Sequence, residues 1–291
     1  MPFNVTYQRG IALVAASAVL WSLNGLALRL IGPAGTWQVL FFRSLGTVPV
    51  LFLLVSATSG GRPFAAIRAA GWPAAIGGFG VVFAFAGAIF SMQTTTIANA
   101  VFLFAAAPLL TAIMARLLLG EAVRRATWVA IAIASIGIFV MVREGLQLGA
   151  GWGNIAALAS AAGFAAFTIT LRWGKLNDMI PAALIGSCLS IIVAALIILA
   201  RGESFALPPR AIAVALIMGA ALIGGGMVLF TAGSRALPAA EAGLLSMVEI
   251  MLAPVWVWFF LSEQTSTGTL AGGAILLFAM SINALSGLRR A

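Results

Sequence analysis

Two of the residues that could carry chemistry in this chain are charged and lie deep inside apolar runs. Arg43 lies within the run Thr36–Val55, and Glu249 lies within the run Pro238–Leu261. A charge at the centre of a bilayer costs at least about 2.5 kcal/mol, so each side chain is expected to face protein or a water-filled cavity. Arg43 could attract a ligand carboxylate, and Glu249 could be an intramembrane proton site. A structural role for both, with Arg43 extending to the interface, is the alternative.

Neutral polar and aromatic side chains supply the other candidates for a binding cavity. Asparagine can donate and accept hydrogen bonds at an amino-acid head group, and aromatic walls suit an apolar or aromatic ligand. The same residues could simply pack helices together or contact lipid, because polar side chains stabilise transmembrane packing by about 0.6 kcal/mol each. The predicted cavity residues are Trp21, Asn24, Arg43, Phe79, Phe83, Asn99, Phe102, Phe164, Ser246 and Glu249.

The residue types that are missing exclude most catalytic and metal chemistry. The chain has no histidine, so it offers no imidazole ligand or base. Its single cysteine, Cys188, can form neither an internal disulfide nor a multi-cysteine metal site. There is no phosphate-binding glycine loop followed by Lys-Ser/Thr, so ATP is not expected to drive any process within this chain. We therefore expect no enzyme, no metal and no cofactor.

Composition places these residues in a membrane. The chain of 291 residues is 63% hydrophobic and 8% charged, and its mean hydropathy is +1.13. The net charge of +9 comes from bases scattered along the loops, which indicates membrane orientation and no nucleic-acid partner. The expected fold is an all-α integral membrane protein of ten transmembrane helices with no soluble domain. The ten runs are Gly10–Ile31, Thr36–Val55, Trp72–Ser91, Ile97–Leu118, Thr127–Val142, Gly153–Leu171, Ile180–Ala200, Ala211–Gly233, Pro238–Leu261 and Gly268–Ser286.

The basic residues predict how the chain is oriented. With the N-terminus in the cytoplasm, eleven Lys and Arg residues fall inside and four fall outside. The four outside are Arg29, Arg143, Arg201 and Arg210. We therefore expect a multi-pass protein of the cell inner (plasma) membrane with both termini cytoplasmic, and a first run that is an uncleaved signal-anchor.

The two halves of the chain resemble each other at a separation of 142–143 residues, which predicts one repeat over 1–145 and a second over 146–291. Five helices in each repeat force the second to insert upside down, the usual construction of secondary transporters. Gene duplication without such a role is the plainer interpretation. The matching positions are Ser17, Trp21, Leu28 and Arg29 with Ser160, Phe164, Leu171 and Arg172, and Leu118–Glu121 with Phe260–Glu263.

Two motifs in register carry a family resemblance. Ala107-Pro108-Leu109-Leu110-Thr111-Ala112 leads to Leu119-Gly120-Glu121, and Glu249-Ile250-Met251-Leu252-Ala253-Pro254 leads to Leu261-Ser262-Glu263. The chain resembles the drug/metabolite transporter superfamily with its EamA-type repeats, and within it the YddG-type exporters of aromatic amino acids. That family usually has Glu-Pro where this chain has Glu249-Ile250. Pro108 and Pro254 lie inside runs and are expected to kink their helices.

The resemblance implies a secondary transporter that exports small amphipathic metabolites, above all amino acids including aromatic ones, by alternating access. It also implies a central cavity lined by helices one to four and six to nine, with the fifth and tenth helices peripheral. A flippase or an exporter of lipids, drugs or other metabolites with the same fold is the alternative. Small-molecule substrates and membrane lipid are the expected partners, and a monomer is plausible.

Overall fold

The computed structural model describes residues 6–123, 125–147, 149–174, 180–237 and 239–288, and every regular element in these ranges is a helix. Eight stretches are long and apolar enough to cross a membrane. Two shorter apolar helices, Leu245–Leu261 and Thr267–Asn283, bring the number found in these ranges to ten. The protein is therefore an all-helical, multi-pass membrane protein, as the hydropathy pattern predicts.

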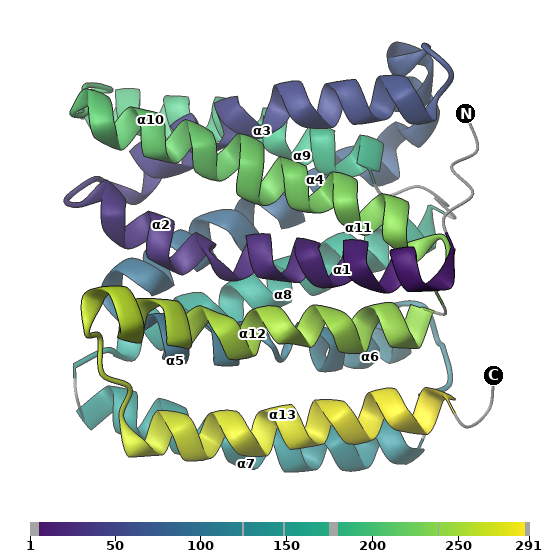
Figure 1. Cartoon of the computed structure of the whole chain (residues 1–291), viewed down its shortest axis with the longest axis vertical. Helices are drawn as coiled ribbons and strands as arrows, with labels where there is room; N and C mark the ends of the chain where they lie inside the picture. The colour runs from purple at the N-terminus through teal and green to yellow at the C-terminus, as the bar shows by residue number, and fades with distance from the viewer. Residues whose placement is uncertain (1–5, 124, 148, 175–179, 238, 289–291) are drawn as a thin grey trace.

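Seven of the described spans form one helix each, one of them with a kink at Gly71, and three are divided (Figure 1). The single helices are α3 (Thr36–Thr58), α4 (Pro63–Thr94), α7 (Arg125–Gln147), α8 (Gly151–Trp173), α9 (Ile180–Ala200), α12 (Ala239–Leu261) and α13 (Thr267–Leu288). The divided spans are α1 (Tyr7–Ser22) with α2 (Asn24–Ile31), α5 (Ile97–Phe104) with α6 (Ala107–Leu118), and α10 (Pro209–Ile217) with the π-helix η1 (Met218–Gly225) and α11 (Gly226–Ser234).

Two of the divisions have local causes in the sequence. Between α1 and α2, the Asn24 amide donates to the carbonyl oxygen of Trp21 at 2.8 Å and competes with the helical hydrogen bonds there. The break between α5 and α6 falls at 105–106, just before Pro108, which has no backbone N–H to continue the ladder. By contrast, α12 continues through Pro254 as one helix.

Eight of the spans form a closed ring in which each packs against two neighbours. In order around the ring they are α1, α12, α5 with α6, α8, α4, α9, α3 and the α10–η1–α11 span, which packs again on α1. The fifth and tenth spans, α7 and α13, pack on each other at one edge of the molecule (Figure 1). This arrangement agrees with the peripheral position that the resemblance implies for those two helices.

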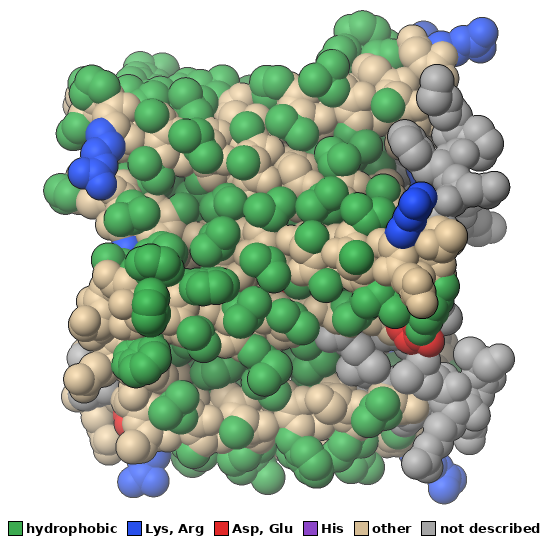
Figure 2. All heavy atoms as spheres, in the orientation of Figure 1, with side chains coloured by type: hydrophobic (Ala, Val, Ile, Leu, Met, Phe, Trp, Pro, Cys, Tyr) green, Lys and Arg blue, Asp and Glu red, His purple; other side chains and the backbone are tan. Residues whose placement is uncertain are grey.

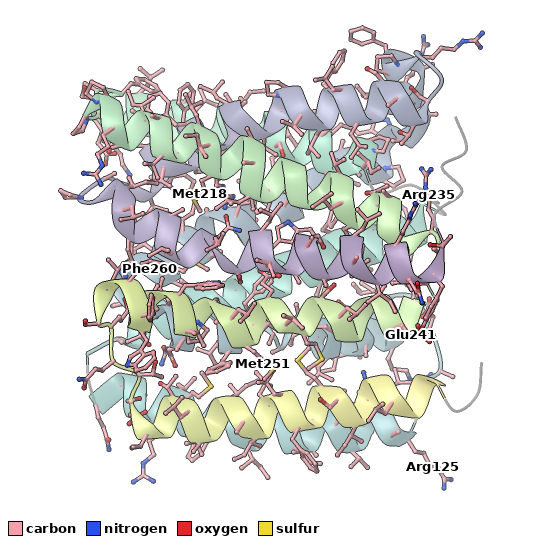
Figure 3. All side chains as sticks on the ribbon, viewed as in Figure 1. Arg125, Met218, Arg235, Glu241, Met251 and Phe260 are labelled. Carbon is pink, nitrogen blue, oxygen red and sulfur yellow. The ribbon has the colours of Figure 1, made fainter. Side chains whose placement is uncertain are left out.

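The helix axes run side by side between two ends of the molecule. Helix α1 begins and α13 ends at the same end, on the right in Figure 1, which we call the terminal side. Arg125, Arg235 and Glu241 lie at the terminal side, and Phe260 lies at the opposite side (Figure 3). Between the ends, the face in Figure 2 is covered by hydrophobic side chains, as expected for a lipid-facing surface.

Helix α3 and η1 approach each other closely through glycines. A Cβ on Gly219 would overlap the carbonyl oxygen of Arg43, and a Cβ on Gly46 would overlap that of Leu216. Thr47 Oγ1 donates to the carbonyl oxygens of Arg43 at 3.0 Å and Gly219 at 3.1 Å. Small residues permit this approach in a membrane, and it fixes Arg43 against a π-helical segment, a type often found at functional sites.

Candidate functional site

An ion pair lies at the side opposite the termini. Arg29 Nε donates to Glu263 Oε2 at 2.8 Å, and Arg29 Nη2 donates to the carbonyl oxygen of Thr95 at 2.9 Å. Glu263 Oε1 accepts from the backbone N–H of Ile97 at 2.7 Å. The two charged side chains are only 27% and 18% exposed. They therefore join the ends of the first and ninth spans to the start of the fourth.

A second ion pair lies at the terminal side. Arg172, at the end of α8, donates through Nη2 to Glu121, which follows α6. These side chains are about half exposed, more than those of the first pair. On the same side, the Tyr7 hydroxyl donates to Glu241 at 2.7 Å and joins α1 to α12. Each side of the bundle thus has a charged contact between spans of the first and second halves of the chain.

The interior of the bundle holds a buried guanidinium. Arg43 is 4% exposed, and its Cζ lies 4.2 Å from the centroid of the Phe85 ring. Its Nε and Nη2 are buried and have no hydrogen-bond partner among the residues that the structure describes. A cation–π contact stabilises the charge but satisfies no N–H donor. Arg43 therefore retains two buried donors, which suit an anion.

Asn24, at the start of α2, offers an unused acceptor. Its amide nitrogen donates to the Trp21 carbonyl, whereas its Oδ1 is buried without a partner in the described part of the chain. The same is true of the hydroxyls of Ser44 and Ser91. Because buried polar groups are normally hydrogen-bonded, these orphaned atoms mark where a polar ligand or water belongs.

Aromatic side chains pair between neighbouring spans. Trp21 packs on Phe230 with ring centroids 5.5 Å apart, so it joins α1 to α11. Phe164 of α8 packs on Phe104 at 5.9 Å and on Phe167 at 6.0 Å. Trp21 and Phe164 are both half-buried and occupy matching positions in the two halves of the sequence. Both predicted residues thus lie between ring-forming spans.

Glu249 lies on the face of α12 that meets α1. Seven residues further along, and so on the same face, Trp256 Nε1 donates to Ser22 Oγ at 2.8 Å. Glu249 is half-buried and makes no hydrogen bond or ion pair with the described residues. Ser246, one turn earlier, donates to the carbonyl oxygen of Ala242 at 2.9 Å. Glu249 therefore has a carboxyl group that no described side chain neutralises.

Asn99 and Phe102 contact neighbouring helices. Asn99 Nδ2 donates to Asn154 Oδ1, and the Thr269 hydroxyl lies 3.5 Å from Asn99 Oδ1, so the network joins α5, α8 and α13. Phe102 is 6% exposed and lies against Gly273 of α13. The structure does not bring these two predicted residues together with Arg43, because their partners lie on the side of the tenth span.

Phe79 and Phe83 lie on an exposed face of α4, 52% and 67% exposed. The faces of α4 that pack on its neighbours carry glycines instead: Gly80 lies against α8, and Gly78 lies against α9. Small residues therefore mark the packed faces of α4, and these two rings lie away from them. That they line a cavity stays a prediction.

Sequence reasoning missed Phe85, the ring that covers Arg43. The signal was present, because Phe85 lies seven residues after Gly78 and so shares its packed face. The two ion pairs were also missed, although their members stand at matching positions in the repeat.

A pocket of about 460 Å³ opens at the side opposite the termini. Arg29 is on its wall, so the ion pair with Glu263 borders it. The other lining residues are Leu28, Gly32, Pro33, Ala34, Gly35, Thr36, Phe90, Gln93 and Thr94.

A ring of membrane-spanning helices with ion pairs at both ends and isolated polar groups between them defines a polytopic helical membrane protein. Residues 8–143 match the model of the EamA-like transporter family. The match covers just under half of the chain and makes this part of it similar to that family of transporters.

The fold has a counterpart among solved structures. One protein known from a crystal structure superimposes with a TM-score of 0.68 and is 18% identical, over 96% of this chain and 97% of its own. At that identity the likeness supports the fold. No curated protein gives a significant match.

Proposed function

We propose that this protein is a secondary transporter that exports small amphipathic metabolites, chiefly amino acids including aromatic ones, across the inner membrane by alternating access. The similarity of residues 8–143 to the EamA-like transporter family supports the transport of small metabolites in general. The finer claims on substrate and mechanism rest on the charged and aromatic contacts described above.

The observation that carries the proposal is the correspondence of the two ion pairs. Arg29 and Arg172 occupy matching positions in the two halves of the sequence, as do Glu121 and Glu263. One pair lies at each side of the bundle, and each joins a span of the first half to a span of the second. In alternating access, the contact at one side opens while the contact at the other stays closed.

The same correspondence supports an inverted repeat with boundaries at 1–145 and 146–291. Two repeats of opposite orientation would place equivalent helix ends at opposite sides of the membrane. The excess of basic residues on the loops of the terminal side supports a cytoplasmic location for both termini.

The interior supports amino acids as substrates. Arg43 supplies free donors for a carboxylate, and Asn24 supplies an acceptor for an ammonium group. Trp21 and Phe164, each packed on another ring, provide aromatic surface between spans. A substrate with a zwitterionic head and an apolar body matches these groups.

Counterflow in proteoliposomes tests the function. Purified protein is reconstituted into vesicles loaded with unlabelled phenylalanine, tryptophan, threonine or lysine, and entry of the labelled compound is followed. We expect saturable exchange of phenylalanine and tryptophan above empty vesicles. Exchange of none of the amino acids would refute the substrate claim, and scrambling of labelled lipids in the same vesicles would favour the flippase alternative.

A further inference from the structure

We propose that Arg43 and Asn24 form a head-group subsite that binds a carboxylate and the ammonium group beside it. The inference rests on the proposed transport function and assigns its substrate recognition to two particular side chains. It starts from three buried atoms without partners, namely Nε and Nη2 of Arg43 and Oδ1 of Asn24.

The two free nitrogens of Arg43 have the geometry of a carboxylate fork. Nε–H and one N–H of Nη2 point in the same direction from one edge of the planar guanidinium, so they donate in parallel to the two oxygens of a carboxylate. Arg29 uses the same two nitrogens when it binds Glu263 and the Thr95 carbonyl. Arg43 therefore presents the same pair of donors for an anion.

The surroundings of Arg43 hold this fork in place. The Phe85 ring covers one face of the guanidinium at 4.2 Å, and a stacked ring leaves the N–H edge free. Gly219 lets η1 pack directly on the backbone of Arg43. The Thr47 hydroxyl bridges α3 and η1 by hydrogen bonds. A fixed fork loses less entropy when it binds its anion than a mobile one would.

Asn24 lies at the same depth as Arg43. Each is seven residues from the end of its helix at the side opposite the termini, about 10 Å along the axis. Both helices border one apolar cluster, to which α2 contributes Leu28, α3 contributes Leu40 and η1 contributes Met218. An ammonium group bound beside the carboxylate would satisfy Asn24 Oδ1, because that atom can only accept hydrogen bonds.

Three related ligands test the subsite on the wild-type protein. L-phenylalanine carries both head groups, 3-phenylpropionate lacks the ammonium group, and phenethylamine lacks the carboxylate. In equilibrium binding to purified protein, we expect phenethylamine to bind roughly 10- to 100-fold more weakly than phenylalanine, the effect of losing charge-assisted hydrogen bonds. If phenethylamine binds as tightly as phenylalanine, or if neither phenylalanine nor 3-phenylpropionate binds, the proposal is overturned.

Substitutions separate recognition from structure. Arg43→Gln is expected to weaken phenylalanine and 3-phenylpropionate roughly 10- to 100-fold and to leave phenethylamine unchanged. Asn24→Ala is expected to weaken phenylalanine and phenethylamine but not 3-phenylpropionate. Arg210→Gln, at an exposed arginine on the same side, is the matched control and is expected to change nothing. Equal weakening of all three ligands by Arg43→Gln would show a structural role and contradict the subsite.

The conservative variant Arg43→Lys keeps the charge but loses the planar fork, so it is expected to recover only part of the carboxylate affinity. Full recovery would contradict the fork geometry. If vesicles exchange compounds that lack a carboxylate as well as they exchange phenylalanine, the subsite fails while the transport function stands. If they exchange nothing, the transport function itself fails.

Discussion

Arg29 and Glu263 form a charge-assisted hydrogen bond of 2.8 Å across 234 residues of sequence, between the ends of the first and ninth spans. Its counterpart at the other side joins Arg172 to Glu121. The first pair is more buried and has additional backbone partners, so it is the stronger contact in this structure. We interpret the two pairs as alternating contacts that limit access to the interior.

Exchange of the two charges of the Arg29–Glu263 pair should restore the counterflow that each single substitution removes. Arg29→Glu and Glu263→Arg each place like charges at one contact and are expected to lower counterflow strongly. The double variant re-forms an ion pair and should recover most of it, with a coupling energy of about 0.5–3 kcal/mol from a double-mutant cycle. Glu203→Gln, which removes the exposed pair with Arg201 on the same side, is the control. Additive effects of the two single changes would contradict a direct functional contact.

Substitution of Gly219 should disrupt the contact between α3 and η1. The Cβ of Gly219→Ala would overlap the Arg43 carbonyl oxygen, and overpacking of this kind costs about 1–3 kcal/mol or more. Gly225→Ala, in the same π-helical segment, has its nearest neighbours 3.8 Å away and should be tolerated. Thermal unfolding of the purified variants in detergent would measure the difference. Equal melting temperatures for the two variants would be inconsistent with the close approach.

Variants at Asn99 and Phe79 compare a residue that packs between helices with a residue on an exposed helix face. Asn99→Ala removes the hydrogen bonds that Asn99 makes with Asn154 Oδ1 and with the Thr269 hydroxyl, and it should destabilise the protein by about 1–3 kcal/mol. Phe79→Ala changes an exposed side chain and should leave both stability and counterflow near wild type. Melting temperature and exchange rate are measured for both variants. Loss of exchange in Phe79→Ala with normal stability would return Phe79 to the substrate cavity.

Glu249 is predicted to couple transport to protons. A carboxylate at this depth has no described cationic partner, and the cost of burying its charge favours taking up a proton. Glu249→Gln mimics the protonated form, so uptake driven by a pH gradient should be lost. Counterflow without a gradient should persist, because exchange needs no net proton movement. An unchanged response of the variant to the pH gradient would remove Glu249 from the coupling mechanism.

The helices could be predicted from the sequence because hydropathy alone sets them in lipid. The seventh span was predicted at Ile180–Ala200 and α9 has those bounds. The third span was predicted to begin at Trp72, whereas α4 begins at Pro63 and passes through a bend at Gly71, where φ is 57°. A glycine tolerates that positive φ, so the chain stays helical on both sides of a residue that looked like a boundary.

The orientation of side chains around the helices could not be predicted to the same extent. The burial of Arg43 follows from the cost of a charge in lipid. No such penalty separates an interior aromatic ring from a lipid-facing one, so the stripe that Phe79 and Phe83 form does not by itself decide which way the two rings face. The contact of Asn99 with Asn154 could not be predicted, because the two residues are 55 apart in the sequence and lie in different halves of the chain.

Accessibility at two matching positions tests whether the two ion pairs open alternately. Leu28 and Leu171 each precede an ion-pair arginine and are 4% and 8% exposed. In a Cys188→Ser background, Leu28→Cys and Leu171→Cys are each labelled with a membrane-impermeant maleimide, in vesicles of both orientations. With Glu263→Gln added, labelling at position 28 should rise and labelling at position 171 should fall; Glu121→Gln should do the reverse. If labelling at both positions changes in the same direction, or at neither position, the two ion pairs do not open alternately.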